Sequence, residues 1–404
     1  MARPLRIALL VESSHGFGRA VLQGIAEYAK AYGPWTFHHE ERAFDDPLPA
    51  GLKKWKPDGI IARITTPPLA RQLHRLAVPT VDLYEQQYRQ RHARVLVDNR
   101  AIVRLAVDHL RECGLQHFAY VGFPGLRFSA ERARLFAECV GLWRFAAHIY
   151  VPPSSGNATR LAAIEATALR QADALAAWLA RLPKPVGILG CNDMRAQQVL
   201  SVCGERGIAV PDEVAVVGID NDEVRCELAA PSLTSVDPNA YRIGYEAAAL
   251  LHRMLRAQRR ARSDILVEPA GVLRRRSTDV LAFTDPGVAE LLRHIRDQAC
   301  KGLSPQRLVQ HTGLSRATLD RWFLKTLGRT PHAEIVRVQM QRVRELLATT
   351  DLPLKQVARL AGFPHVETMY RAFRRATGQT PAEYRRTTGS RRSPGRPAAE
   401  PAHH

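Results

Sequence analysis

The chain has 404 residues, of which 46% are hydrophobic and 24% charged, and its formal net charge at pH 7 is +19. This length exceeds one ordinary core, so two or three domains are expected, and the absence of any run of about 18 apolar residues argues against a membrane span. The basic charge favours a polyanionic partner, while six scattered cysteines without a CxxC pair favour reduced thiols in the cytoplasm over disulfides or a zinc site.

The first 280 residues alternate short apolar runs with amphipathic segments. The runs are LRIALLV, DGIIARI, VPTVDLY, RVLVDN, HFAYVGF, VGILGC, VAVVGIDND and LTSVD, and helical patterns such as AIVRLAVDHLRECG lie among them. The N-terminal segment MARPLRIALLVESS has no small-residue cleavage site, so it is expected to be a buried first strand and not a signal peptide. This alternation predicts an α/β fold with doubly wound parallel sheets and helices on both faces.

Polar side chains follow several of the predicted strands. They are Glu12, Ser13, Ser14 and Arg19 after the first strand, Asp98 and Asn99 after VLV, Asn192 and Asp193 after GILGC, and Asp220, Asn221 and Asp222 after VVGI. Ligands of such sheets bind at the carboxyl ends of the strands. Carboxylates, amides and an arginine complement sugar hydroxyls, which both donate and accept hydrogen bonds, so a sugar-like effector is expected.

Some of these residues also have a purely structural interpretation. Asp98 or Asn99 can cap the helix AIVRLAVDHL, and Asp193 can cap a helix that begins at Met194. His15 is expected to be a surface loop residue and not a catalyst. The sequence has no recognisable Ser/His/Asp motif, paired-carboxylate motif or P-loop, so we expect no enzyme, no cofactor and no metal site.

The C-terminal part contains a duplicated helix-turn-helix pattern. The segment LVQHTGLSRATLDRWFLKTLGRTP recurs as VARLAGFPHVETMYRAFRRATGQTP, with Gly313 matching Gly362 and Pro331 matching Pro381. Residues 286–388 hold 18 Lys and Arg against 8 Asp and Glu, whereas the longer segment before them holds 37 against 30. Two such motifs in a basic segment predict binding to double-stranded DNA, with the second helix of each in a major groove.

The second helix of each copy has a predicted inner and outer face. Leu319, Trp322 and Phe323 are expected inside the first copy, which Pro305 begins, and Met369, Ala372 and Phe373 inside the second. The residues left for DNA contact are Arg316, Ala317, Thr318, Asp320 and Arg321 in copy one, and His365, Val366, Glu367, Tyr370 and Arg371 in copy two. Their chemistry suits base edges, although about half of the charges can instead contact phosphates or solvent. A long helix from Pro331 is expected to hold the two copies about 34 Å apart on one DNA face.

Longer segments resemble known families. GILGCNDMRAQQVLSVCGERGIAVPDEVAVVGIDND, followed by APSLTSVDPNAYRIGYEAAALL, resembles the effector domain of LacI-type repressors, which is similar to periplasmic sugar-binding proteins. The C-terminal repeat resembles the AraC/XylS family, and the join RRRSTDVLAFTDPGVAELLRHIRDQACKGL resembles xylose-operon regulators, which have this domain order. The resemblance spans about residues 5–388. It implies a two-lobed effector-binding and dimerisation domain over 1–282 and a DNA-binding domain over 283–388, and the Pro-rich tail 389–404 is expected to be disordered.

The resemblance also implies roles for particular residues. A pentose or other monosaccharide would bind in the cleft between the lobes, with Asp220 gripping adjacent hydroxyls. The other implied effector contacts are Ser13, Arg19, Asp98, Arg132 in SAERARLF, Asn192, Asp193 and Asp237. The first loop, ESSHGFGR, differs from that of the xylose regulators, so the resemblance does not identify the sugar.

The expected protein is a cytoplasmic homodimer that activates transcription with RNA polymerase and has no membrane partner. Two alternatives remain open at this point. One is an effector-independent architectural DNA-binding protein whose N-terminal domain only dimerises. The other is a sugar-modifying enzyme tethered to DNA, which the missing catalytic motif disfavours.

Overall fold

The computed structural model describes residues 3–43, 46–84, 92–153, 172–257, 264–280, 286–327 and 329–388. The chain forms two compact units, Met1–Thr284 and Asp285–His404. The tail 389–404, predicted to be disordered, lies outside the described residues. No helix in the described ranges is both long enough and apolar enough to cross a membrane.

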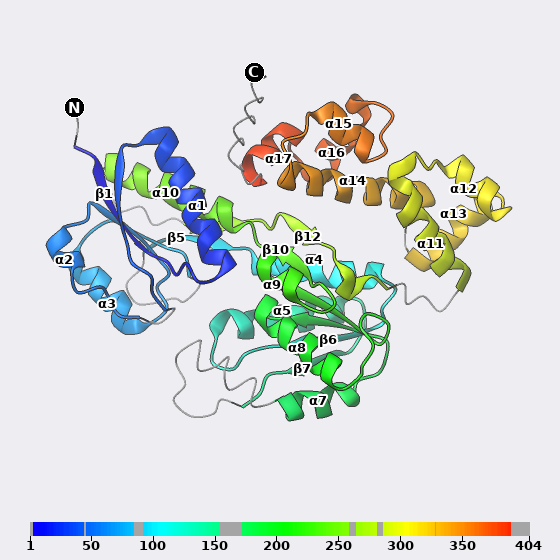
Figure 1. The fold of residues 1–404 in the computed structure, drawn as a ribbon, viewed down its shortest axis with the longest axis horizontal. Helices are drawn as coiled ribbons and strands as arrows, with labels where there is room; N and C mark the ends of the chain where they lie inside the picture. Colours follow the sequence, from blue (N-terminus) through cyan, green and yellow to red (C-terminus); the bar gives the residue numbers. More distant parts are fainter. Residues whose placement is uncertain are drawn as a thin grey trace, which may run out of the picture. The chain divides into compact units, whose positions relative to one another are not determined.

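The first lobe of the N-terminal unit is built on a parallel sheet with the strand order β11-β5-β4-β3-β1-β2 (Figure 1). Its strands are β1 (Leu5–Leu10), β2 (Trp35–His39), β3 (Gly59–Ala62), β4 (Thr80–Asp82), β5 (Ala93–Val97) and β11 (Asp264–Val267). Side chains of β1 alternate between two cores. Ile7 and Leu9 pack with α1 (Gly16–Tyr32) and α10 (Ala240–Ala257), and Ala8 and Leu10 pack with α2 (Leu52–Trp55) and α3 (Pro67–Leu76). Burial on both faces explains why these strands are continuous apolar runs.

The second lobe repeats this layered arrangement with the strand order β12-β10-β9-β8-β6-β7. Its strands are β6 (His117–Val121), β7 (Ala147–Tyr150), β8 (Val186–Gly190), β9 (Val214–Ile219), β10 (Thr234–Asp237) and β12 (Gly271–Leu273). They pair in parallel except for the edge strand β12, which is antiparallel to β10. Helices α4 (Asn99–Glu112) and α5 (Arg127–Leu142) cover one face. Helices α7 (Ala172–Ala180), α8 (Asp193–Glu205) and α9 (Glu223–Leu228) cover the other, and the short helix η1 (Arg276–Thr278) packs near β9.

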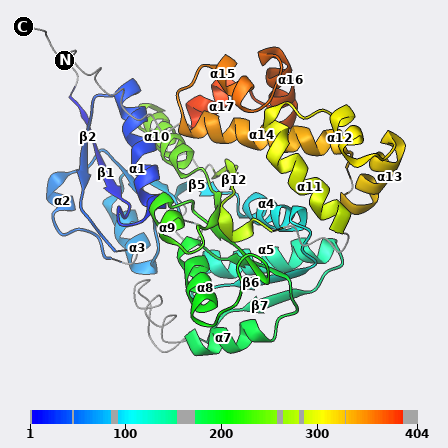
Figure 2. The same ribbon diagram turned by 45° about the vertical axis from the view of Figure 1, so that its right-hand side comes forward.

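The chain passes between the two lobes after β5, after β10 and between β11 and β12. The return after β10 brings α10 against α1 in the first lobe (Figures 1 and 2). Gly24 and Gly244 allow this close approach, because a Cβ on Gly24 would lie 2.0 Å from the Tyr241 carbonyl oxygen and one on Gly244 would lie 2.0 Å from the Val21 carbonyl oxygen. The packing anchors α1, whose N-terminal end faces the second lobe.

The C-terminal unit is helical in its described residues. Its elements are α11 (Pro286–Gln298), η2 (Ala299–Lys301), α12 (Pro305–Thr312), α13 (Arg316–Leu327), α14 (Pro331–Thr349), α15 (Leu354–Leu360), α16 (Val366–Thr377) and α17 (Pro381–Thr388). The first helix-turn-helix pair is α12 with α13, and the second is α15 with α16. Both turns use a left-handed glycine, Gly313 at φ +67° and Gly362 at φ +80°, which explains their matching positions in the repeat. Figure 2 shows α11 to α13 at one end of α14 and α15 to α17 at the other.

The predicted inner faces of the second helices are largely confirmed. Leu319 and Phe323 are buried in the first pair, and Met369 and Phe373 are buried in the second. Trp322 and Ala372 are only half-buried. The fold class predicted from the apolar pattern and the repeat is therefore confirmed in both units.

Candidate functional site

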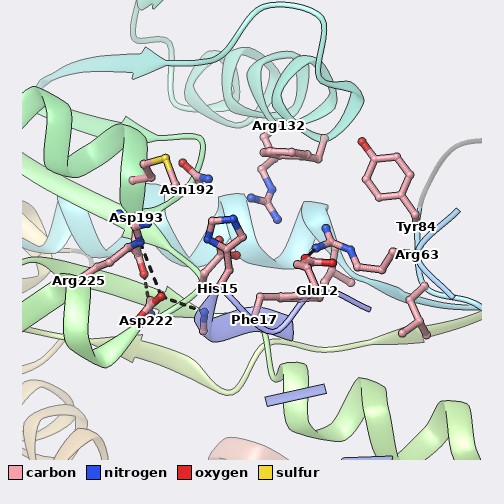
Figure 3. A pocket seen from close by; sticks show the side chains of 16 residues that line it. Glu12, His15, Phe17, Arg63, Tyr84, Arg132, Asn192, Asp193, Asp222 and Arg225 are labelled. Carbon is pink, nitrogen blue, oxygen red and sulfur yellow. Dashed lines mark hydrogen bonds and ion pairs between the residues drawn. The ribbon is translucent and has the colours of Figure 1, made fainter. Parts of the chain in front are cut away.

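Side chains of both lobes enclose a cavity of about 80 Å³ at the carboxyl ends of the parallel strands (Figure 3). The first lobe contributes Glu12, His15, Gly16, Phe17, Arg63, Leu83, Tyr84 and Val97, and the second contributes Phe128, Arg132, Asn192, Asp193, Met194, Asp220, Asp222 and Arg225. One buried water needs roughly 10–15 Å³. The cavity therefore has room for a small polar molecule and not for a polymer.

Asp220 presents a carboxylate to this cavity. It follows β9 in a left-handed conformation with φ at +115°, and its backbone N–H donates to the Val236 carbonyl at 3.1 Å. No described protein group forms a hydrogen bond with its side chain. Burial raises the pKa of Asp220 to about 6, although the nearby guanidinium groups of Arg132 and Arg63 favour its charged form. At neutral pH the carboxylate is mostly ionised and can accept hydrogen bonds from a ligand.

Two arginines, one from each lobe, approach the same space (Figure 3). Arg63, directly after β3, forms an ion pair with Glu12 and lies over the rings of Phe17 and Tyr84 at 4.9 and 5.7 Å. Arg132 of α5 donates from Nε to Asn99 Oδ1 at 2.9 Å and from Nη1 to the Cys191 carbonyl at 2.5 Å. These contacts hold both guanidinium groups in place before any ligand binds.

Asp222 connects the two lobes directly. Its Oδ2 accepts a hydrogen bond from the backbone N–H of Gly16 at 2.9 Å, and its carboxylate lies 3.6 Å from Arg19 and 3.8 Å from Arg225. His15, at the N-cap position of α1, provides no side-chain cap, so an acid from the other lobe takes that role. The pKa of His15 is lowered by burial and by Arg225, which favours its neutral form.

Asp193 supports the loop that carries Asp220 and Asp222. The residue is only 1% exposed, and its carboxylate accepts hydrogen bonds from the Asp222 N–H at 2.8 Å and the Ser235 hydroxyl at 2.5 Å. Burial and the neighbouring Asp220 raise its pKa well above the ordinary value. Both carboxylate oxygens therefore bind protein, although the residue borders the cavity. Asn192, and not Asp193, caps α8 by accepting from the Arg195 N–H at 2.9 Å.

Four of the predicted effector residues do not border this cavity. Ser13 hydrogen-bonds to Glu41, and the exposed Arg19 donates to the Ser13 and Ser14 carbonyls. Asp98 caps α4 by accepting from the Ala101 N–H at 2.9 Å, as the structural interpretation anticipated. Asp237 accepts from the Asn239 N–H at 2.7 Å. Their contact with an effector stays a prediction, whereas Arg132, Asn192, Asp193 and Asp220 do meet at the cavity.

Several cavity residues escaped the sequence reasoning. His15 was expected on the surface, but it is half-buried in the cavity wall because α1 begins beside it and the first residue of α1, Gly16, contacts Asp222 of the second lobe. Glu12 and Asp222 belong to the polar residues that follow the strands, but they were not predicted to contact the effector. Arg63 directly follows β3, so the same strand-end rule would have found it. Tyr84 also lies two residues after a strand, β4, but it is aromatic and the rule was applied to polar residues, whereas Phe17 and Phe128 lie in the first turns of α1 and α5 and had no comparable signal.

The predicted DNA-contacting side chains lie on α13, α16 and the residue before α16. Exposed side chains are Arg316, Ala317 and Arg321 on α13, and His365, Glu367 and Arg371 on or before α16; half-buried ones are Thr318, Asp320, Val366 and Tyr370. Thr318 Oγ1 lies 2.8 Å from Ser315 Oγ at the start of α13, and Val366 packs partly against the core of the second pair. Contact of these residues with DNA stays a prediction.

Three protein-family models match successive parts of the chain. They are the XylR N-terminal domain over residues 6–98, a periplasmic binding protein-like domain over 107–278 and a helix-turn-helix domain over 308–387. The xylose operon regulatory protein of Escherichia coli strain K12 is 34% identical over 391 residues, which cover 94% of this chain and 96% of that protein. The protein of the same name from Haemophilus influenzae is 32% identical, covering 94% and 98%.

Solved structures are similar as well. One described as the xylose-binding transcription activator xylR is 31% identical with a TM-score of 0.61, covering 96% of this chain and all of the other. A periplasmic binding protein/LacI transcriptional regulator from Alkaliphilus metalliredigens, complexed with D-xylulofuranose, covers 67% of this chain and 98% of its own. At 21% identity and a TM-score of 0.54, it shares the two-lobed fold.

Proposed function

The chain belongs to the family of xylose operon regulatory proteins and is a sugar-responsive, DNA-binding transcription regulator, and from this premise we propose that its effector is an uncharged monosaccharide held in the cavity between the lobes. The observation that carries the proposal is the Asp220 carboxylate, which faces the cavity without a hydrogen bond from a described protein group. A carboxylate can accept from two adjacent hydroxyls, and hydrogen bonds to charged groups contribute about 1.5–3 kcal/mol each.

The charge balance of the cavity favours a neutral ligand. Arg63 pairs with Glu12, and Arg225 lies 3.8 Å from Asp222. Arg132 is held by neutral oxygens, and its charge favours the ionised form of Asp220. Three arginines thus face the carboxylates of Glu12, Asp220 and Asp222, while burial raises the pKa of the fourth acid, Asp193, and favours its neutral form. A sugar acid or sugar phosphate would bring an additional buried negative charge without a matching cation.

The apolar part of the wall suits the carbon skeleton of a sugar. Phe17 and Tyr84 stand on one lobe and Phe128 on the other, next to the arginines that lie over their rings. Small-ligand sites commonly combine such apolar walls with a few fixed polar groups. The limited volume favours a single ring of pentose or hexose size.

In the proposed mechanism the sugar stabilises closure of the lobes and thereby shifts the populations of the DNA-binding states. The exposed side chains of α13 and α16 read successive major grooves, and the protein acts in the cytoplasm as a homodimer that activates transcription with RNA polymerase. Its relatives are transcription regulators, and we propose that the bound sugar is sensed and not converted.

Calorimetry on the full-length protein tests the effector class. D-xylose and other neutral sugars such as D-ribose and D-glucose are compared with D-xylonate and D-xylose 5-phosphate. We expect at least one neutral sugar to bind, to be recovered unchanged, and at 100 times its Kd to add about 2.7 kcal/mol of stability. Tighter binding of the acid or the phosphate would overturn the neutral-ligand proposal. DNA binding that no sugar alters would instead favour the architectural alternative.

A further inference from the structure

A broad groove on the C-terminal unit carries positive charge beyond that of the two reading helices, α13 and α16. It is lined by η2, the start of α12, one face of α14, the end of α15 and the turn after it, and α16. Six permanent cations border it: Lys301, Arg337, Arg344, Arg359, Arg371 and Arg375. No Asp or Glu in the described part of the chain lines it. We call it the basic groove.

Most of these cations lack an acidic partner. Arg337 pairs with the buried Glu334 at 2.7 Å. The other five form no ion pair within the described residues. Pairing elsewhere on the same unit is common, as in Arg342 with Glu345 at 2.8 Å. Concentrated, unpaired positive charge costs stability by self-repulsion, and an anionic ligand would relieve that cost.

The walls of the basic groove are held rigidly to each other. The buried Gln339, in the middle of α14, donates from Nε2 to the Ala299 carbonyl of η2 at 2.9 Å and to the Gly362 carbonyl of the second pair at 3.0 Å. Gly362 also packs so closely that a Cβ there would lie 2.5 Å from the Ala299 oxygen. The groove is therefore formed before a ligand arrives.

The groove includes part of the reading helix α16 and adjoins a recess beside the other, α13. At one end Pro305 and His332 also border a recess that contains Arg316 and Asp320 of α13. At the other end it includes Arg371 and Arg375 of α16. A ligand that follows the groove and the recess from α16 to α13 would therefore be extended, and the cations along the groove favour a polyanion.

We propose that the basic groove binds the sugar-phosphate backbone of duplex DNA between the two major grooves that α13 and α16 occupy. The proposal rests on the proposed DNA-reading function and adds to it the residues that position the duplex. Arg344 of α14 and Arg359 at the end of α15 are the main positioning residues, because neither belongs to a reading helix. Phosphate contacts of this kind set register and affinity without sequence preference.

The test measures DNA affinity of the full-length protein against salt concentration by fluorescence anisotropy. The double variant Arg344→Gln, Arg359→Gln is compared with wild type and with the control Arg342→Gln, which lies on α14 outside the groove lining. We expect the slope of log K against log salt to become shallower by about 0.9 per lost phosphate contact, hence up to about 1.8, with unchanged base preference. The control should keep the wild-type slope.

A charge-retaining variant, Arg344→Lys with Arg359→Lys, separates the loss of phosphate contacts from misfolding and should restore most of the slope. An unchanged slope in the glutamine variant would overturn the proposal, and so would an altered base preference. A loss of affinity for single-stranded RNA without a loss of affinity for duplex DNA would overturn it as well. Absence of sequence-specific binding by the wild-type protein would instead refute the proposed function itself.

Discussion

Replacing Asp222 with alanine is expected to destabilise the protein even without sugar, because this carboxylate joins the two lobes. It accepts a hydrogen bond from the Gly16 N–H at 2.9 Å, where α1 begins without a side-chain cap of its own. It also lies 3.6 Å from Arg19 of the first lobe. The variant therefore loses a helix cap and an ion pair across the cleft.

The magnitude follows from these contacts. A backbone hydrogen bond to a carboxylate contributes about 1.5–3 kcal/mol, and loss of an N-cap costs about 0.5–2 kcal/mol. The pair with Arg19 adds little, because that side chain is 44% exposed and exposed pairs contribute about 0–1 kcal/mol. We expect a loss of about 1.5–3 kcal/mol, which lowers the melting temperature of a unit of this size by about 3–6 °C.

Differential scanning calorimetry of the sugar-free protein and titration with the identified sugar provide the assay. Thr66→Ala is the matched control, because Thr66 caps α3 by accepting from the Leu69 N–H at 3.4 Å within one lobe. The control should lose stability but keep its sugar affinity. Asp222→Ala should lose both, since its closed form is less populated. A sugar-free melting temperature equal to or above that of the wild type would refute the link between the lobes.

Asp220→Asn should weaken sugar binding about 10- to 150-fold, the equivalent of about 1.5–3 kcal/mol, and leave sugar-free DNA affinity unchanged. Because the pKa of Asp220 is raised to about 6, calorimetry should show wild-type affinity falling between pH 7.5 and 5 as the carboxylate is protonated, and a flat profile would contradict its role. Arg321→Ala and Arg371→Ala should relax base preference in different half-sites about 10 base pairs apart, which selection of preferred DNA sites by each variant would measure. Variants that select the same sites as the wild type and only bind them more weakly would indicate phosphate contacts. Gly24→Ala should cost about 1–3 kcal/mol in a denaturant titration, because its Cβ would strike the α10 backbone, whereas Gly204→Ala in α8, with open space around it, should be neutral or stabilising.

The cavity was only partly predictable from the sequence. Asp220, Asp193 and Asn192 could be found because the carboxyl ends of parallel strands meet at one sheet edge. Their individual roles could not be predicted, because each role depends on which hydrogen-bond donors approach each side-chain oxygen. Asp193 is occupied by the Asp222 N–H and the Ser235 hydroxyl, whereas the Asp220 carboxylate receives no hydrogen bond from a described group.

The sequence by itself determined the layered α/β fold, the duplicated helix-turn-helix pairs and the order of the two units, because apolar periodicity and glycine positions report local backbone requirements. Only the tertiary structure decided that His15, Arg63 and Asp222 share a cavity, since these residues come from strands and loops far apart in the chain. The tertiary structure likewise brings Arg344 and Arg359 into one groove through the contacts of Gln339 with both of its sides. Periodicity within a segment records which face is buried but not which distant segment covers it.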